Sequence, residues 1–252
     1  MGVSISTAWP GRRPAIVRAV LLGALIFAGL ASASLARERH GARHVHRHAV
    51  HARRTERHRH RHLVRGIDVS HYQGTINWRG VAKDDVAFAY VKATEGVAGR
   101  DAQFARNWRG ARRQGVRVGA YHYFVFCRSA RAQARNFLAV APRTASALPP
   151  AVDLEPSHSC ARGLGGPEVR RELTAYLAIV EARQKRRAVL YVTPQFYAAY
   201  GPYLPRRQMW RRSISLASTP SGSWTFWQYG DRGHVTGIRS RVDVNLVRES
   251  AL

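Results

Sequence analysis

Cysteine and acidic residues are scarce in this sequence. The chain holds two cysteines and 15 Asp and Glu residues among 252, whereas Lys and Arg number 41. No cluster of cysteines or carboxylates accompanies the 12 histidines, which argues against a metal site. No motif interleaves aromatic and basic residues as nucleic-acid-binding modules do, so the formal charge of +26 does not indicate a nucleic-acid partner.

The basic residues concentrate in one stretch. Between Arg37 and Arg65 lie ten of the 41 Lys and Arg residues and eight of the 12 histidines. Such a segment has too little apolar surface to offset the entropy lost on ordering, so residues 37–65 are predicted to be a disordered His/Arg-rich linker. It could buffer metal ions, act as a spacer, or tether the protein to an anionic cell-wall or membrane surface. The irregular histidine spacing favours the last two roles.

The N-terminal sequence has the pattern of an export signal. An uncharged apolar segment at residues 19–31 follows three arginines and ends in small residues, which is typical of a secretory signal peptide. The uncharged stretch continues to Ala36, so an uncleaved membrane anchor is the alternative for residues 1–36. Both predict a periplasmic or secreted protein. Oxidising conditions there allow Cys127 and Cys160 to pair, with two free buried thiols as the alternative.

From Gly66 onward, apolar runs alternate with segments of helical character. Pro149 and Pro150 precede one such run, Ala151–Leu154. Alternation of strands and helices predicts an α/β fold with a largely parallel sheet, and seven strands with a helix-poor region after Pro194 predict an irregular (β/α) barrel over residues 66–252. The other predicted strands are Gly66–Ser70, Phe88–Thr94, Val118–Phe124, Val189–Thr193, Trp224–Tyr229 and Val242–Leu246, and the predicted helices are Ala102–Gln114, Ala130–Val140 and Pro167–Gln184.

Acidic residues recur at the ends of these predicted strands. Asp153 and Glu155 are two residues apart, so on a strand both point to one face, and their mutual repulsion makes one proton harder to remove. Asp68 and Asp243 also fall late in their strands, and functional residues of such barrels gather at the carboxyl ends of strands. We therefore expect these four acids to share one mouth, together with other polar residues late in or just after strands, namely Glu95, Tyr121, His122, Tyr123, Tyr191 and Gln228. The alternative is a set of solvated strand ends.

The motifs that surround these acids resemble a known family. The sequence is similar to glycoside hydrolase family 25 lysozymes over essentially all of Gly66–Leu252. This resemblance implies a TIM-barrel-like fold with fewer helices than strands and no cofactor. It implies cleavage of the β-1,4 bond between N-acetylmuramic acid and N-acetylglucosamine in peptidoglycan. The motifs that carry it are Gly66–Gly74, Phe88–Gly96, Gly119–Phe124, Val152–Glu155, Trp227–Tyr229 and Val242–Asn245.

The resemblance also implies roles for single residues. Glu155 would be the general acid, with Asp153 orienting the substrate acetamido group or supporting the oxocarbenium-like centre, and Asp68 and Asp243 positioning the substrate and tuning that pair. A retaining mechanism with substrate assistance and an inverting one both stay open. The expected groove residues are Tyr121, Tyr123, Tyr191 and Gln228, whereas Trp227 is expected to pack and His71 and His122 could be structural or contact the ligand.

Two functions remain as alternatives to a muramidase. One is a peptidoglycan-binding pseudoenzyme without turnover, and the other is a chitinase-like glycosidase, because Asp-x-Glu at a strand end also occurs there. The protein is expected to act as a monomer. Alignment with the family pattern is insecure across Tyr203–Ser223, which leaves one strand unassigned.

Overall fold

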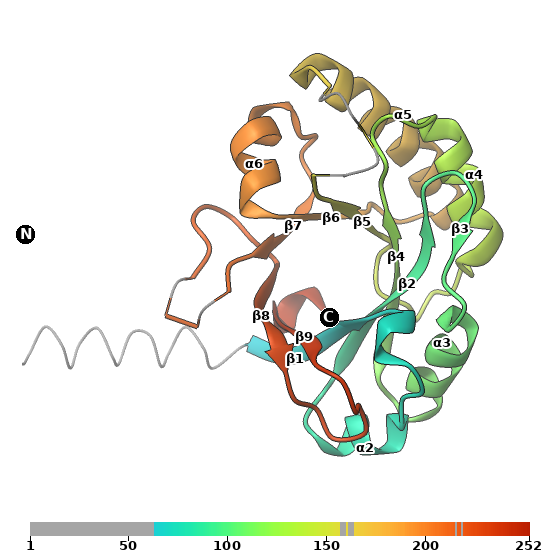
Figure 1. Cartoon of the computed structure of the whole chain (residues 1–252), viewed down its shortest axis with the longest axis vertical. Helices are drawn as coiled ribbons and strands as arrows, with labels where there is room; N and C mark the ends of the chain where they lie inside the picture. Colours follow the sequence, from blue (N-terminus) through green and yellow to red (C-terminus); the bar gives the residue numbers. More distant parts are fainter. Residues whose placement is uncertain (1–62, 157–159, 161–163, 215, 218) are drawn as a thin grey trace, which may run out of the picture. The chain divides into compact units, whose positions relative to one another are not determined.

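Eight β-strands close into a barrel (Figure 1) in the part of the chain that the computed structural model describes, residues 63–156, 160, 164–214, 216–217 and 219–252. The predicted signal peptide or anchor and residues 37–62 of the predicted linker lie outside this part. Around the ring the order is β1-β9-β8-β7-β6-β5-β4-β2, and pairing of β1 with β2 closes it. The strands are β1 (Leu63–Val69), β2 (Phe88–Glu95), β4 (Arg117–Tyr123), β5 (Ala151–Leu154), β6 (Val189–Val192), β7 (Gln208–Arg212), β8 (Phe226–Gly233) and β9 (Val242–Arg248), with a short β3 (Gly99–Arg100) beside β2.

One strand of the barrel runs against the other seven. Neighbouring strands from β1 through β2, β4, β5, β6 and β7 to β8 are parallel, whereas β9 is antiparallel to both β8 and β1. The start of β9 therefore lies at the same end of the barrel as the carboxyl ends of the other strands. The predicted α/β barrel is confirmed, and its sheet is largely but not wholly parallel.

Helices are fewer than strands, as predicted. The described residues contain five α-helices, and the three predicted helical segments correspond to α3, α4 and α5. None of the helices in the described part is long and apolar enough to cross a bilayer. The α-helices are α2 (Trp78–Lys83), α3 (Phe104–Arg113), α4 (Ala130–Val140), α5 (Gly166–Gln184) and α6 (Pro194–Tyr200), and the 3-10 helices are η1 (His71–Gln73), η2 (Gly201–Tyr203) and η3 (Glu249–Ala251).

The strand that the sequence left unassigned is β7. Its residues include three that are charged or amide-bearing, so the hydrophobic alternation of a strand is hard to recognise. Trp210 points into the barrel, and Arg211 points out, where its guanidinium lies 3.5 Å from the ring centroid of Tyr197 in α6. This cation–π contact lets a buried arginine occupy an outward strand position.

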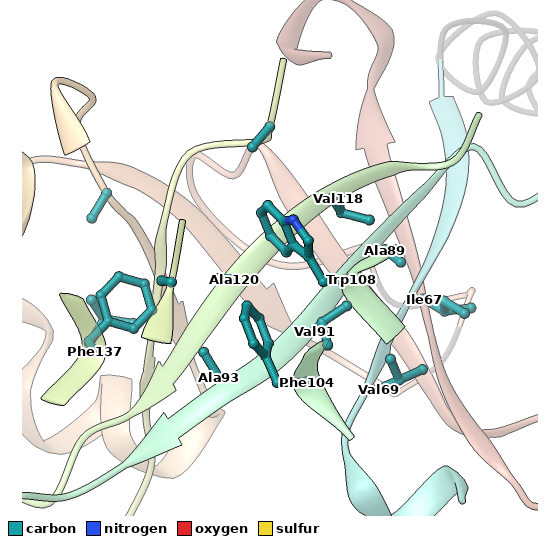
Figure 2. Packing of buried hydrophobic residues seen from close by; sticks show 14 of the residues in the cluster. Ile67, Val69, Ala89, Val91, Ala93, Phe104, Trp108, Val118, Ala120 and Phe137 are labelled. Carbon is teal, nitrogen blue, oxygen red and sulfur yellow. The ribbon is translucent and has the colours of Figure 1, made fainter. Parts of the chain in front are cut away.

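Alternation along the strands builds two separate apolar layers. Outward residues such as Ile67, Val69 and Val91 pack with Phe104 and Trp108 of α3 in the larger layer (Figure 2). Inward residues form a second cluster inside the barrel. A strand residue therefore faces either the helices or the lumen, and every second residue of a strand near the carboxyl end reaches the mouth.

Aromatic rings fill the barrel below the mouth. Phe88, Tyr90, Trp210 and Phe226 are buried there, and the Tyr90 ring centroid lies 4.8 Å from that of Trp210. Gly119 makes room for this packing, because a Cβ on it would lie 2.3 Å from the Tyr90 ring. The rings close the lumen, so the mouth is a pocket and not the entrance of a channel.

Candidate active site

The four predicted acids line one pocket at the mouth of the barrel. This mouth pocket has a volume of about 160 Å³, and Asp68, Asp153, Glu155 and Asp243 all contribute to its wall. Each of the four is half-buried. The predicted convergence of acids from three separate stretches of sequence is therefore what the structure contains.

Strand β5 supplies the first pair. Val152 and Leu154 are fully buried in the outer layer, and Asp153 between them points into the mouth pocket. Glu155 follows the end of β5 and points to the same side. The predicted sharing of one face by the two acids is correct, and its cause is the two-residue period of a strand.

Asp243 corrects one sequence prediction. It was expected late in its strand, but it is the second residue of β9. Because β9 is antiparallel, this beginning lies beside the carboxyl end of β1, and Asp243 is directly opposite Asp68 in the ladder. The predicted position of Asp243 at the mouth was right, but the predicted direction of its strand was wrong.

Asp68 is held by two amide side chains. Its Oδ2 accepts hydrogen bonds from Nδ2 of Asn245 at 2.8 Å and from Nε2 of Gln228 at 3.2 Å. These amides are fixed in turn, since Nε1 of Trp210 donates to Asn245 and the hydroxyl of Tyr191 donates to Gln228, both at 2.8 Å. The chain of bonds orients Asp68 and leaves little freedom to the side chains around it.

Burial raises the pKa of both acids of the β1–β9 pair. For Asp243, burial and then the charge of Asp68 raise the pKa to about 9. For Asp68, burial also raises the pKa, against the hydrogen bonds from Asn245 and Gln228, which favour the charged form. The two carboxyl groups hydrogen-bond to each other, which requires a proton on one of them, and the direction of these effects puts it on Asp243.

The β5 pair also retains a proton. Burial, followed by the charges of Glu155 and Asp68, raises the pKa of Asp153, and Lys92 acts in the opposite direction. Oδ1 of Asp153 is buried and has no hydrogen-bond partner among the described residues. The pocket therefore contains a carboxyl pair in which the raised pKa of Asp153 favours retention of a proton, together with one buried carboxyl oxygen that has no partner among the described residues.

Comparison with known proteins identifies the family of the chain. Residues 67–238 match the model of the glycosyl hydrolases family 25. The chain belongs to this family. It is 35% identical over 202 residues to lysozyme M1 of Streptomyces globisporus, covering 75% of this chain and 69% of that protein.

Solved structures agree with the family assignment. A family 25 glycosyl hydrolase from Bacillus anthracis has a TM-score of 0.68 at 34% identity, covering 73% of this chain and 88% of that one. The bacterial lysozyme from Streptomyces coelicolor also has a TM-score of 0.68, at 32% identity, covering 75% of this chain and 98% of that one. The protein is thus a glycoside hydrolase with a family 25 barrel.

The predicted groove residues of this family 25 chain divide into two groups. Tyr121, Tyr191 and Gln228 line the mouth pocket. Tyr123 is not part of its wall, and its ring lies beneath the ammonium of Lys92, with 5.1 Å between nitrogen and ring centroid. The structure thus places three of the four in the wall of the pocket, while Tyr123 lies opposite Asp153 in the β4–β5 ladder and contacts the pocket residue Lys92.

The two histidines have different surroundings. His122 is buried on the outer side of β4, where its ring nitrogens lie 2.7 Å from Oγ1 of Thr94 and 3.1 Å from Oε1 of Gln133. Burial lowers its pKa to about 4. His71 is on the rim, with Nδ1 2.8 Å from Oδ2 of Asp101. Of the two alternatives for His122, the structural one holds, because the ring faces the helices and not the pocket.

The sequence prediction missed several residues in or beside the pocket. Lys92, Trp210 and Tyr72 line the pocket, and Asn245 bonds to Asp68. For Lys92 and Asn245 a signal existed, since Asn245 is two residues after Asp243 and Lys92 is two residues after the inward Tyr90. Tyr72 is 77% exposed and offers an aromatic face beside the acids.

A disulfide joins two loops at the mouth. Cys127 follows β4 and Cys160 follows β5, and their Cα atoms are 5.6 Å apart. The bond ties together the segments that leave two neighbouring strands beside the acids. Among the described residues, no three His, Cys, Asp or Glu side chains are arranged to hold a metal ion.

Proposed function

We propose that the protein is a muramidase that hydrolyses the β-1,4 bond between N-acetylmuramic acid and N-acetylglucosamine in peptidoglycan. The observation that carries this proposal is the set of four carboxyl groups in one small pocket of a family 25 barrel. Glycosidases need one carboxyl group that gives a proton to the leaving oxygen and another that supports the positive charge developing on the sugar. The mouth pocket holds a candidate for each role, Glu155 as the proton donor and Asp153 as the group that supports the charge.

The β5 pair is assigned to bond cleavage. Glu155 lies after the strand end, and as general acid it would protonate the glycosidic oxygen. Asp153, deeper in the pocket, would orient the acetamido group of the substrate through its unpaired Oδ1 or support the oxocarbenium-like centre. The mutual repulsion of the two carboxyl groups, which contributes to the raised pKa of Asp153, keeps a proton in this pair at neutral pH.

The β1–β9 pair is assigned to support. Asp68 accepts bonds from Asn245 and Gln228 and adds its charge to the effects that raise the pKa of Asp153. Asp243 shares a proton with Asp68 and holds it in place. Together they position the sugar and help the β5 pair retain its proton. Tyr121 and Tyr191 offer their faces to the sugar rings.

The test is release of reducing ends from purified peptidoglycan. The wild type is expected to release them, and Glu155→Gln is expected to lower the rate at least about 10³-fold while the thermal unfolding curve stays the same. Glu172→Gln on α5 is the matched control, because it makes the same chemical change outside the pocket, and it should keep full activity. Substantial activity of Glu155→Gln would contradict the assignment of the general acid.

Two further assays separate the alternative functions. If the protein is a peptidoglycan-binding pseudoenzyme, the wild type will release no sugar from any substrate. A chitinase-like enzyme would cleave chitin oligomers faster than peptidoglycan. We expect turnover with peptidoglycan and little with chitin.

We also propose that the protein works outside the cytoplasm as a monomer. The signal-like residues 1–36 and the disulfide between Cys127 and Cys160 support the location outside the cytoplasm. The basic stretch at 37–65 would hold the enzyme near an anionic cell-wall or membrane surface. Fractionation of cells that express the full chain should recover the protein outside the cytoplasm. Recovery in the cytoplasm alone would contradict it.

A further inference from the structure

A second hollow lies at the opposite end of the barrel from the acids. It is formed by the segments that lead into β5, β6, β7 and β8, where those strands begin, and its volume is about 640 Å³. Four of the ten residues that line this arginine hollow are arginines: Arg186 and Arg187 before β6, and Arg206 and Arg207 before β7.

Three of these four arginines form no ion pair with a carboxylate in the part of the chain that the structure describes. Glu181 pairs with Arg207 alone, through two bonds of 2.6 and 2.8 Å. Arg186 donates to the backbone oxygen of Ala147, and Arg187 donates to that of Arg206. Among the described residues, the Arg206 side chain has no hydrogen bond or ion pair.

This arrangement leaves unbalanced positive charge in a concave space. Arg186, Arg187 and Arg206 are exposed, so water hydrates them, and among the described residues Glu181 is the one carboxylate that forms an ion pair with an arginine of the hollow. The floor between them is apolar and aromatic, with Met209 and Trp224. A polyvalent anion placed there would neutralise several charges at once and cover part of this floor.

We propose that the arginine hollow binds phosphate groups of a phosphodiester-linked polymer. Guanidinium groups donate in a fixed fork that matches phosphate oxygens, and arginines from two loops can bond oxygens that point in different directions. The volume lies within the range of about 300–1,000 Å³ that is usual for ligand clefts, so it has room for a sugar or polyol unit beside the phosphate.

The observations favour a polymer over a membrane. Binding to a bilayer surface uses exposed apolar side chains that enter the lipid beside the cations. The large apolar side chains that are exposed among the described residues are Tyr72, Val97, Tyr197, Tyr203, Ile214 and Leu216, and none of them lines the hollow. The charges lie in a recess that a polymer strand can enter.

The site extends the proposed function without depending on it. The hollow lies where the strands begin and the mouth pocket lies where most of them end, with the aromatic rings of the barrel interior between them. Both can be occupied together, so the hollow would hold the protein on an anionic polymer while the mouth faces a glycan. Binding at the hollow is measured without turnover, so failure of the muramidase assay does not affect the test.

The test compares two double variants of the full chain. R187Q/R206Q removes two charges from the hollow. R109Q/R113Q removes two exposed charges from α3, which borders neither pocket. Binding of a poly(glycerol phosphate) oligomer is measured by calorimetry at about 150 mM salt, with uncharged polyglycerol as the ligand control. Thermal unfolding checks that both variants fold, and the segment 37–65 is identical in all three proteins.

The proposal expects at least about a tenfold loss of affinity for R187Q/R206Q and less than a twofold loss for R109Q/R113Q. Equal losses in the two variants would overturn it, because net charge alone would then explain binding. No loss in either variant would also overturn it. Vesicles of phosphatidylcholine and phosphatidylglycerol at three to one provide the membrane arm: a loss by R187Q/R206Q on vesicles but not on the polymer would overturn the assignment to a polymer.

Discussion

The two ends of the barrel carry opposite charges. At the mouth, four half-buried carboxyl groups line one pocket, and Asp68 accepts hydrogen bonds from two amide side chains. At the other end, the arginines of the hollow are mostly exposed and bond mainly to backbone oxygens. Burial at the mouth makes protonation part of the chemistry, whereas exposure at the hollow leaves the charges free to attract a partner.

The origin of the two ends also differs. Three of the four acids at the mouth come from strands and the fourth, Glu155, directly follows β5, so their positions are set by the barrel geometry. Those of the hollow come mainly from the segments before the strands. Sites on rigid elements hold reacting groups accurately, and sites on connecting segments tolerate a ligand of variable shape. This contrast suits a catalytic pocket and a holding site.

Among the changes that test the contrast between the mouth and the arginine hollow, Asp68→Asn is expected to have the largest effect. The change removes the charge that accepts from Asn245 and Gln228, and we expect a loss of about 10²-fold in kcat on peptidoglycan. Affinity for the phosphodiester oligomer at the hollow should not change. Asp85→Asn, an exposed acid, is the control and should leave kcat unchanged. A kcat for Asp68→Asn within twofold of wild type would show that Asp68 does not contribute to catalysis.

The next effect concerns the wall of the mouth. Replacing both cysteines, Cys127→Ser with Cys160→Ser, frees a loop that the disulfide closes across 33 positions. The loss of cross-linking is expected to lower the free energy of unfolding by about 3 kcal/mol. Urea unfolding of the oxidised wild type and the variant measures it. A difference below about 0.5 kcal/mol would show that the bond does not hold the two loops.

A smaller effect should follow from Trp210→Phe. Phenylalanine keeps an aromatic ring between the two ends but loses the Nε1 bond to Asn245, so one amide that positions Asp68 becomes loose. We expect kcat to fall about fivefold to tenfold with KM nearly constant, because Trp210 acts through Asn245. A change in KM alone would instead make Trp210 a substrate contact.

The smallest effect is on the pH dependence of stability. Asp243 keeps its proton up to about pH 9 in the folded protein, whereas the unfolded chain releases it near pH 4. Folding therefore takes up a proton between these values, and the contribution of Asp243 to stability falls as pH rises through this window. Asp243→Asn lacks this proton uptake.

The Tm of the Asp243→Asn variant relative to wild type should consequently rise by about 3 °C between pH 5 and pH 8, equivalent to about 1 kcal/mol after allowing for solvent screening. Calorimetry at several pH values measures it. A Tm difference that stays constant with pH would mean that Asp243 is ionised in the folded protein.

The sequence predicted what depends on local period and motif. The shared face of Asp153 and Glu155 follows from the two-residue repeat of a strand, and the barrel follows from alternating strands and helices. The direction of β9 could not be predicted, because antiparallel pairing with β1 and β8 depends on contacts far apart in sequence.

Strand β7 and the arginine hollow could not be predicted for a related reason. Strand β7 has Arg211 at an outward position where an apolar residue is expected, and its partner Tyr197 belongs to another element. The arginine hollow combines segments before four strands, and in a chain with 41 Lys and Arg residues no single pair of arginines draws attention. Such clusters become visible only when the barrel brings the segments together.

Mass spectrometry of the products from a defined muropeptide tests the central claim most directly. We expect the wild type to produce fragments with N-acetylmuramic acid at the new reducing end and Glu155→Gln to produce none. Fragments with N-acetylglucosamine at the new reducing end, or no fragments from the wild type, would contradict it.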